Sequence, residues 1–142
     1  MDSRSGRDRT ERQGAQRALV PALAASAGAH AALVPSHAAE SPLVGTLFAA
    51  SALVLAGVCV LVDRSGRRAV EAAALLLGGL LALYAASRMT AVWPLAHVES
   101  VDAVGAITKL LEAAGLMLAL SLLRVPSGSD ETLRAAREGA GR

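Results

Sequence analysis

Four continuous apolar runs constrain this chain more than any other feature of its sequence. They cover about residues 18–39, 42–62, 69–92 and 103–123, and only short polar segments separate them. Each run is about 20 residues long, the length that an α-helix needs to cross roughly 30 Å of hydrocarbon. The runs are rich in Ala and Leu and do not alternate, which argues against transmembrane strands. The sequence therefore predicts an all-α, polytopic membrane protein, a four-transmembrane-helix bundle with short loops that spans residues 18–123.

The basic residues predict the orientation of this bundle. Of the 14 Lys and Arg residues, five lie in 1–17, three in 63–68 and four in 124–142, whereas 36–41 and 93–102 contain none. Cytoplasmic loops of membrane proteins carry an excess of Lys and Arg. We therefore expect a multi-pass protein of the plasma membrane with both termini and the 63–68 loop in the cytoplasm. The polar residues 1–17 are predicted to be a disordered arm, and 124–142 a cytoplasmic tail.

Composition excludes several other classes of protein. The chain has three aromatic residues, too few for a platform that stacks single-stranded nucleic acid, and one cysteine, which rules out a disulfide framework. The net charge of +2 reflects membrane topology rather than a nucleic-acid surface. The sequence contains no Gly-rich phosphate loop, nucleophile elbow or H-E-x-x-H motif, so it predicts no catalytic residue and does not favour an enzyme. The expected partners are the lipid bilayer and either other membrane proteins or further copies of this chain in a homo-oligomer.

The first apolar run also admits a second interpretation. It contains Pro21 and Pro35, and its Ala27-Gly28-Ala29 matches the A-x-A pattern of a signal-peptide cleavage site. Cleavage would leave His30 at the mature N-terminus, where the next dozen residues resemble the start of periplasmic copper-resistance β-sandwich proteins that use this histidine as a ligand. Nothing after Pro42 could form a β-sandwich, and proline interrupts the short h-region. A retained helix is the leading interpretation, and cleavage is the alternative.

A few ionisable residues lie inside the runs, mostly in the half of the bundle predicted to face outward. When each run is centred on the bilayer, His30 and Glu112 both fall within about 3 Å of the midplane. Lys109 lies roughly 6 Å outward on the same helical face as Glu112, and Arg88 lies near the outer interface. Ionisable groups inside a membrane usually face the bundle interior and have a function. We predict a polar intramembrane site of His30, Arg88, Lys109 and Glu112, the alternative being a Lys109–Glu112 pair that only neutralises itself.

A second group of residues has the spacing of metal ligands. His37 and Glu40 are one helical turn apart, and His30 lies two turns earlier on the same face. These three residues are candidate ligands for a transition metal ion such as copper, zinc or iron, and the outer loop 93–102 holds further candidates. Pro35 lies between the two histidines, and a kink or helix end there would break their alignment. The alternative is that His37 and Glu40 lie in a solvated interfacial loop.

Small residues at four-residue spacing predict where helices pack closely in a membrane. They occur as Ala24/Gly28/Ala32, Gly45/Ala49, Ala52/Ala56 and Gly78/Ala82/Ala86. The alternative is that the high alanine content produces these spacings by chance.

The candidate site residues carry a resemblance to a protein family. The pattern consists of His30-x6-His37-x2-Glu40, Gly45, Phe48, Ser87-Arg88, Pro94, Glu99, Asp102 and Glu112. Over about residues 30–120 the chain resembles an uncharacterised family of four-helix integral membrane proteins from actinobacteria, defined by an H-x6-H-x2-E motif. The resemblance implies the fold and the choice of residues, but no reaction. We accordingly expect the inner (plasma) membrane of a bacterium.

Two functions fit these observations. The first is the binding or passage of a metal ion or a proton through the polar site, with Glu112 as the counter-charge. The second is a non-enzymatic structural or accessory subunit whose buried polar residues only stabilise helix packing.

Overall fold

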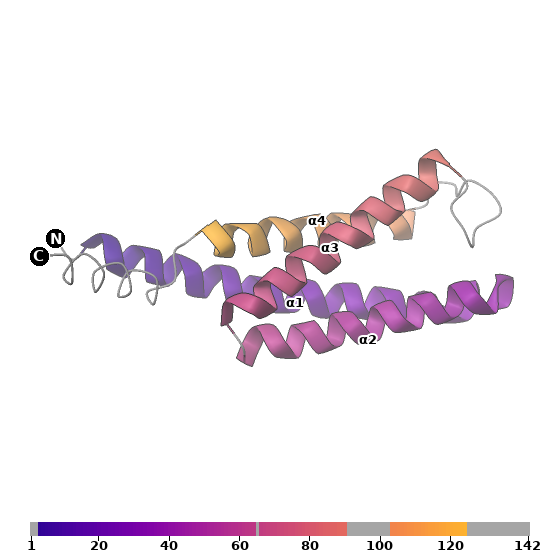
Figure 1. Ribbon diagram of the computed structural model, residues 1–142, viewed down its shortest axis with the longest axis horizontal. Coiled ribbons are helices and arrows are strands. Elements are labelled where there is room, and N and C mark those ends of the chain that lie inside the picture. Colours follow the sequence, from indigo (N-terminus) through magenta and orange to yellow (C-terminus); the bar gives the residue numbers. More distant parts are fainter. Residues whose placement is uncertain (1–2, 65, 91–102, 125–142) are drawn as a thin grey trace, which may run out of the picture.

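The computed structural model describes residues 3–64, 66–90 and 103–124, and the regular structure within these residues is entirely helical (Figure 1). Four helices follow one another: α1 (Ser3–Glu40), α2 (Pro42–Arg64), α3 (Gly66–Met89) and α4 (Ala103–Arg124). Each of them contains a segment long and apolar enough to cross a membrane. The prediction of an all-helical chain with four such helices is confirmed. The outer loop 93–102, with its candidate ligands, and the tail after Arg124 lie outside the described residues.

The first helix is longer than its apolar run. α1 begins at Ser3, so residues 3–17, for which the composition predicts a disordered arm, continue the helix in the structure. Nine of its fifteen residues, five of them Arg, are Arg, Gln, Glu or Ala, which favour helix. α1 also passes through Pro21 and Pro35 without ending. A proline already has a helical φ and removes one backbone hydrogen bond, whereas a helix end within an apolar span leaves several backbone groups unsatisfied.

The helices alternate in direction and give the bundle two distinct ends (Figure 1). At the Ser41 end, α1 turns into α2, α3 finishes and α4 begins; at the Gly66 end, α2 is followed by α3. α1 packs against α2 and α4, while α3 packs against α4 and less extensively against α2. Each helix therefore packs mainly against two neighbours. α3 runs obliquely in Figure 1, and its last turns lie away from α2.

A tight turn joins α1 to α2. The N–H of Ser41 donates to the carbonyl of His37 at 2.8 Å, and the N–H of Gly45 donates to the carbonyl of Ser41 at 3.0 Å. Pro42 begins α2, at a position where the missing N–H costs nothing. A Cβ atom at Gly45 would lie 2.5 Å from the Cβ and 2.6 Å from the Cα of Ala38. Glycine at position 45 therefore allows α1 and α2 to approach this closely.

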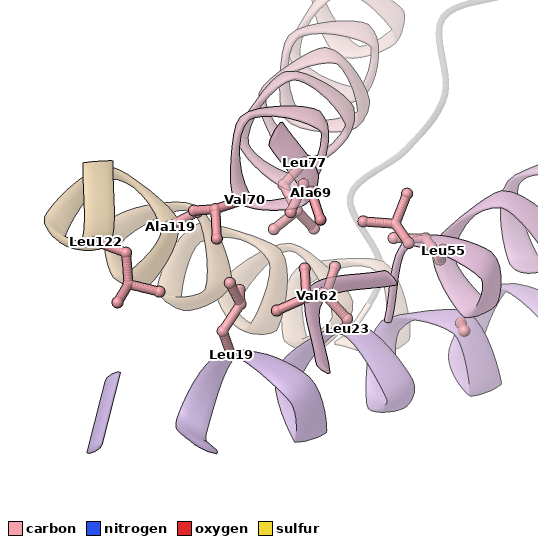
Figure 2. Packing of buried hydrophobic residues seen from close by; sticks show 12 residues of the cluster. Leu19, Leu23, Leu55, Val62, Ala69, Val70, Leu77, Ala119 and Leu122 are labelled. Atoms are coloured by element: carbon pink, nitrogen blue, oxygen red, sulfur yellow. The ribbon is translucent and has the colours of Figure 1, made fainter. Parts of the chain in front are cut away.

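The hydrophobic core lies in the half of the bundle near the Gly66 end (Figure 2). A Cβ atom at Gly115 of α4 would lie 3.0 Å from Cδ1 of Leu77 and 3.5 Å from Cβ of Ala22, so α4 closely approaches α3 and α1 here. All four helices contribute to the core: Leu19, Leu23, Ala27, Leu55, Val58, Val62, Ala69, Val70, Ala73, Leu77, Ala119 and Leu122.

The small-residue spacing predicted only part of this packing. Gly45 makes a close contact, but Ala24, Gly28 and Ala32 are exposed. Nothing lies within 4 Å of a Cβ atom placed at Gly28 or Gly78. The expected close contact at Gly28 is therefore wrong, because a high alanine content produces such spacings on outward faces as well.

Most apolar surface of the helices points outward. The share of residues buried within the most apolar window of each helix is 22% to 28%. Leu53, Leu75 and Leu110 are 75%, 79% and 71% exposed. Water would penalise so large an apolar exterior, whereas hydrocarbon would not. Four such helices indicate a multi-pass membrane protein.

Candidate functional site

A buried ion pair lies in the half of the bundle near the Ser41 end. The carboxylate of Glu112 on α4 is completely buried. Nζ of Lys109, one turn earlier on α4, donates to Oε1 at 2.7 Å and to Oε2 at 2.6 Å. The Lys109 side chain is 16% exposed. Because the two charges cancel, each lowers the cost of burying the other.

Helix α1 supplies two further neighbours of Glu112. The hydroxyl of Ser26 donates to Oε1 of Glu112 at 3.3 Å. The buried imidazole of His30 places Nε2 3.8 Å from the same oxygen. Nδ1 of His30 lies 3.0 Å from the backbone carbonyl oxygen of Ser26. Ser26 therefore contacts the carboxylate through its hydroxyl and the imidazole through its carbonyl. His30 lies next to Glu112, as expected from their equal predicted depths in the membrane.

The contacts of His30 define a place for one proton. A carbonyl oxygen only accepts hydrogen bonds, so Nδ1 carries the hydrogen that points to Ser26. In the neutral ring Nε2 then has only a lone pair, and it faces a carboxylate oxygen of Glu112, which is also an acceptor. Two acceptors 3.8 Å apart repel each other. A single added proton replaces this repulsion by attraction: on Nε2 it gives an imidazolium beside a carboxylate, and on Oε1 it gives a carboxylic acid that can donate to Nε2.

Arg88 is connected to the ion pair through Tyr84. Cζ of Arg88 lies 4.4 Å from the centroid of the Tyr84 ring, and Nζ of Lys109 lies 5.5 Å from the same centroid. An aromatic ring attracts cations electrostatically. Tyr84 and Arg88 are one turn apart on α3, so both reach this end of the bundle together. The four residues of the predicted polar site thus form one connected group, which Arg88 joins through an aromatic ring.

The three candidate metal ligands do not converge. Nδ1 of His37 lies 3.7 Å from Oε2 of Glu40 near the end of α1, while His30 faces Glu112. The Phe48 ring of α2 contacts both imidazoles, with centroid distances of 5.5 Å to His30 and 4.1 Å to His37. Within the described residues, no group of three or more His, Cys, Asp or Glu side chains is placed to hold a metal ion. His30, His37 and Glu40 form no common metal site there, because the Phe48 ring lies between the histidines.

Sequence reasoning assigned no site role to three side chains that shape this region. Ser26 lies one turn before His30, and Tyr84 lies one turn before Arg88. That i−4 spacing places each on the face of its polar neighbour, and it is the signal that could have identified both. Phe48 belongs to the pattern that resembles a family, but hydropathy alone gives no reason to place it between two histidines.

Comparison with known proteins identifies no relative of this chain. No family model, no curated protein and no solved structure matches it. Membership of the family that the chain resembles therefore stays a prediction, and function is argued from the site.

Proposed function

We propose that this chain is a multi-pass protein of a bacterial plasma membrane that binds a proton between His30 and Glu112. The Ser41 end would face outward and both termini the cytoplasm. The positive-inside rule supports this orientation, because α-helical membrane proteins keep Arg-rich ends in the cytoplasm. The described helices carry nine arginines towards the Gly66 end: Arg4, Arg7, Arg9, Arg12, Arg17, Arg64, Arg67, Arg68 and Arg124.

One observation carries the proposal. Nε2 of His30 and Oε1 of Glu112 lie 3.8 Å apart, with side chains that are 6% and 0% exposed. The carbonyl of Ser26 fixes the hydrogen of His30 on the other ring nitrogen. The geometry therefore offers two acceptors to one proton in a place that water barely reaches. Ionisable residues inside membranes commonly form proton relays and binding sites.

A proton fits the site better than a metal ion does. The described His and Glu side chains do not gather in threes, as the protein ligands of a zinc site do. Binding is also better supported than passage across the membrane. Immediately beyond Glu112, towards the Gly66 end, Gly115 lies against Leu77 and Leu19, which begin the apolar core. The described residues thus favour a site that exchanges its proton with one side.

The proposal is tested by infrared difference spectroscopy on the protein in lipid nanodiscs, between acidic and basic pH, combined with ¹⁵N NMR of the histidines. We expect either a carboxylic acid band from Glu112 or an imidazolium signal from His30 to appear on acidification. Glu112→Gln should remove the carboxylic acid band and weaken the imidazolium signal, because the amide carries no negative charge to favour a proton on His30 and can itself donate to Nε2. Glu71→Gln is the matched control, since Glu71 is exposed and paired with Arg67 on the surface. If neither signal in the wild type responds to pH, the proposal is wrong.

A specific observation also favours the second candidate, a structural or accessory subunit. Lys109 and Glu112 neutralise each other within α4, and the Ser26–Glu112 hydrogen bond ties α1 to α4. If the polar residues only stabilise packing, the wild type should show no pH-dependent signal, and Glu112→Gln should change only the free energy of unfolding. The spectroscopic experiment separates the two functions directly.

A further inference from the structure

A line of polar side chains leads from the buried site to the Ser41 end of the bundle. The side chains of His30, His37 and Glu40 are 6%, 23% and 71% exposed, so exposure rises steadily along the last turns of α1. Nδ1 of His37 lies 3.7 Å from Oε2 of Glu40. This nitrogen is buried and makes no hydrogen bond. His37 is therefore the titratable group between the exposed carboxylate and the buried imidazole.

The aromatic ring of Phe48 interrupts this line. His30 and His37 are seven residues apart on one helix, which is about 10 Å along its axis. The centroid of the Phe48 ring lies 4.1 Å from that of His37, with the two rings stacked, and 5.5 Å from that of His30, with the two rings tilted. A ring that contacts both imidazoles at this spacing lies between them. It is an apolar barrier to proton movement in the structure as it stands, and a side-chain rotation would remove it.

Among the described neighbours of the site, Lys109 is another partly exposed titratable group: it is 16% exposed, against 23% for His37, and its ammonium already donates to both oxygens of Glu112. Towards the Gly66 end the site meets Leu19, Leu23 and Leu77, which are at most 1% exposed. On α3, the centroid of the Tyr84 ring lies 4.4 Å from Cζ of Arg88 and 5.5 Å from Nζ of Lys109. The titratable and charged groups that face the site are His30, His37 and Glu40 from α1, Tyr84 and Arg88 from α3, and Lys109 and Glu112 from α4, while α2 contributes the apolar Phe48.

We propose that protons reach the His30–Glu112 site from the Ser41 end through Glu40 and His37, and that the Phe48 ring sets the rate of this exchange. The carboxylate of Glu40 takes a proton from hydronium and leaves water. His37 gains that proton at Nδ1 and releases one from its other ring nitrogen. A rotation of Phe48 then admits a water molecule, which takes the released proton as hydronium and delivers it to the gap between Nε2 of His30 and Oε1 of Glu112. The inference rests on the proposed proton binding and adds its route and its rate control.

The experiment is a rapid pH jump on the full chain in lipid nanodiscs, followed by time-resolved infrared absorption of the Glu112 carboxyl group and the His30 ring. His37→Gln should slow the change on the order of 10²-fold, the contribution that a positioned acid–base group typically makes. Phe48→Leu should make it several-fold faster, because a smaller, non-planar side chain blocks the route less. Neither substitution should change the extent of proton binding once equilibrium is reached. Leu47→Ala is the matched control, since Leu47 lies beside Phe48 on α2 and is 45% exposed.

The outcomes distinguish this inference from the proposed function. If neither Glu112 nor His30 responds to pH in the wild type, both are wrong. If either responds, but His37→Gln and Phe48→Leu leave the rate unchanged, the route is wrong and proton binding stands. The two expected effects have opposite signs and come from different helices, so a general loss of folding cannot reproduce both. A slower rate in Phe48→Leu would also overturn the inference.

Discussion

The two halves of this bundle use the same four helices but hold them together in different ways. Near the Gly66 end, Leu and Val side chains meet in a continuous apolar core (Figure 2). Near the Ser41 end, Ser26, His30, Lys109 and Glu112 are held by directional contacts. Lipid is as apolar as leucine, so the apolar half depends on close packing, whereas the polar half depends on each group having its partner. We expect the apolar half to weaken gradually on substitution and the polar half to fail when one partner is lost.

The largest effect is expected from breaking the ion pair. Lys109→Met removes the ammonium that donates to both oxygens of Glu112 and leaves a fully buried carboxylate. We expect a loss of about 3–5 kcal/mol in the free energy of unfolding, as for other buried pairs deprived of one partner. Reversible denaturation in detergent micelles at neutral pH measures it.

The double variant Lys109→Met/Glu112→Leu is the control for this loss. With no charge left buried, it should recover most of the lost free energy. If the double variant is as unstable as Lys109→Met alone, the effect comes from packing and the polar half differs little from the apolar half.

A smaller effect is expected in the apolar half. Leu77→Ala opens a cavity in the core, where Leu77 is 1% exposed, and should cost about 2–3 kcal/mol. Leu75→Ala, at a position 79% exposed on the same helix, should stay within about 0.5 kcal/mol of the wild type. Thermal unfolding of both variants checks this. Proton binding at Glu112 should survive Leu77→Ala; its loss would mean that the two halves are not separate.

The smallest effect is expected from Ser26→Ala. The hydroxyl that donates to Glu112 is lost, but the backbone carbonyl that orients His30 remains. A cost of about 0.6–1 kcal/mol in the free energy of unfolding follows, as for typical hydrogen bonds between membrane helices. Ser121→Ala is the control, because the exposed Ser121 bonds only to a carbonyl of its own helix. Equal losses in the two variants would remove Ser26 from the site.

The sequence predicted the length of the helices and the depth of each residue along the helix axis, because both follow from hydropathy and the rise per residue. The length of the apolar runs gave the helices, and the equal depth of His30 and Glu112 put them within reach of each other. The sequence did not predict the rotation of each helix about its axis, that is, which face points inward. Lipid and core are both apolar, so a membrane helix has no strong hydrophobic face to orient it. For that reason Gly28 was expected at a contact and is exposed, while Phe48 between two histidines was not expected at all. The sequence did not predict that α1 begins at Ser3. A polar composition shows that residues 3–17 are solvated, but it does not show whether their backbone is helical.

The most direct test of proton binding is ¹⁵N NMR of His30 in lipid bilayers over a range of pH. We expect Nδ1 to keep its hydrogen throughout, because it points to the carbonyl of Ser26. We also expect the ¹⁵N signal of Nε2 to change with pH, because Nε2 either gains the proton or accepts a hydrogen bond from protonated Glu112, and Glu112→Gln should weaken this change. A ring that carries its hydrogen on Nε2 and leaves Nδ1 bare, or an Nε2 that does not respond to pH, would contradict the account.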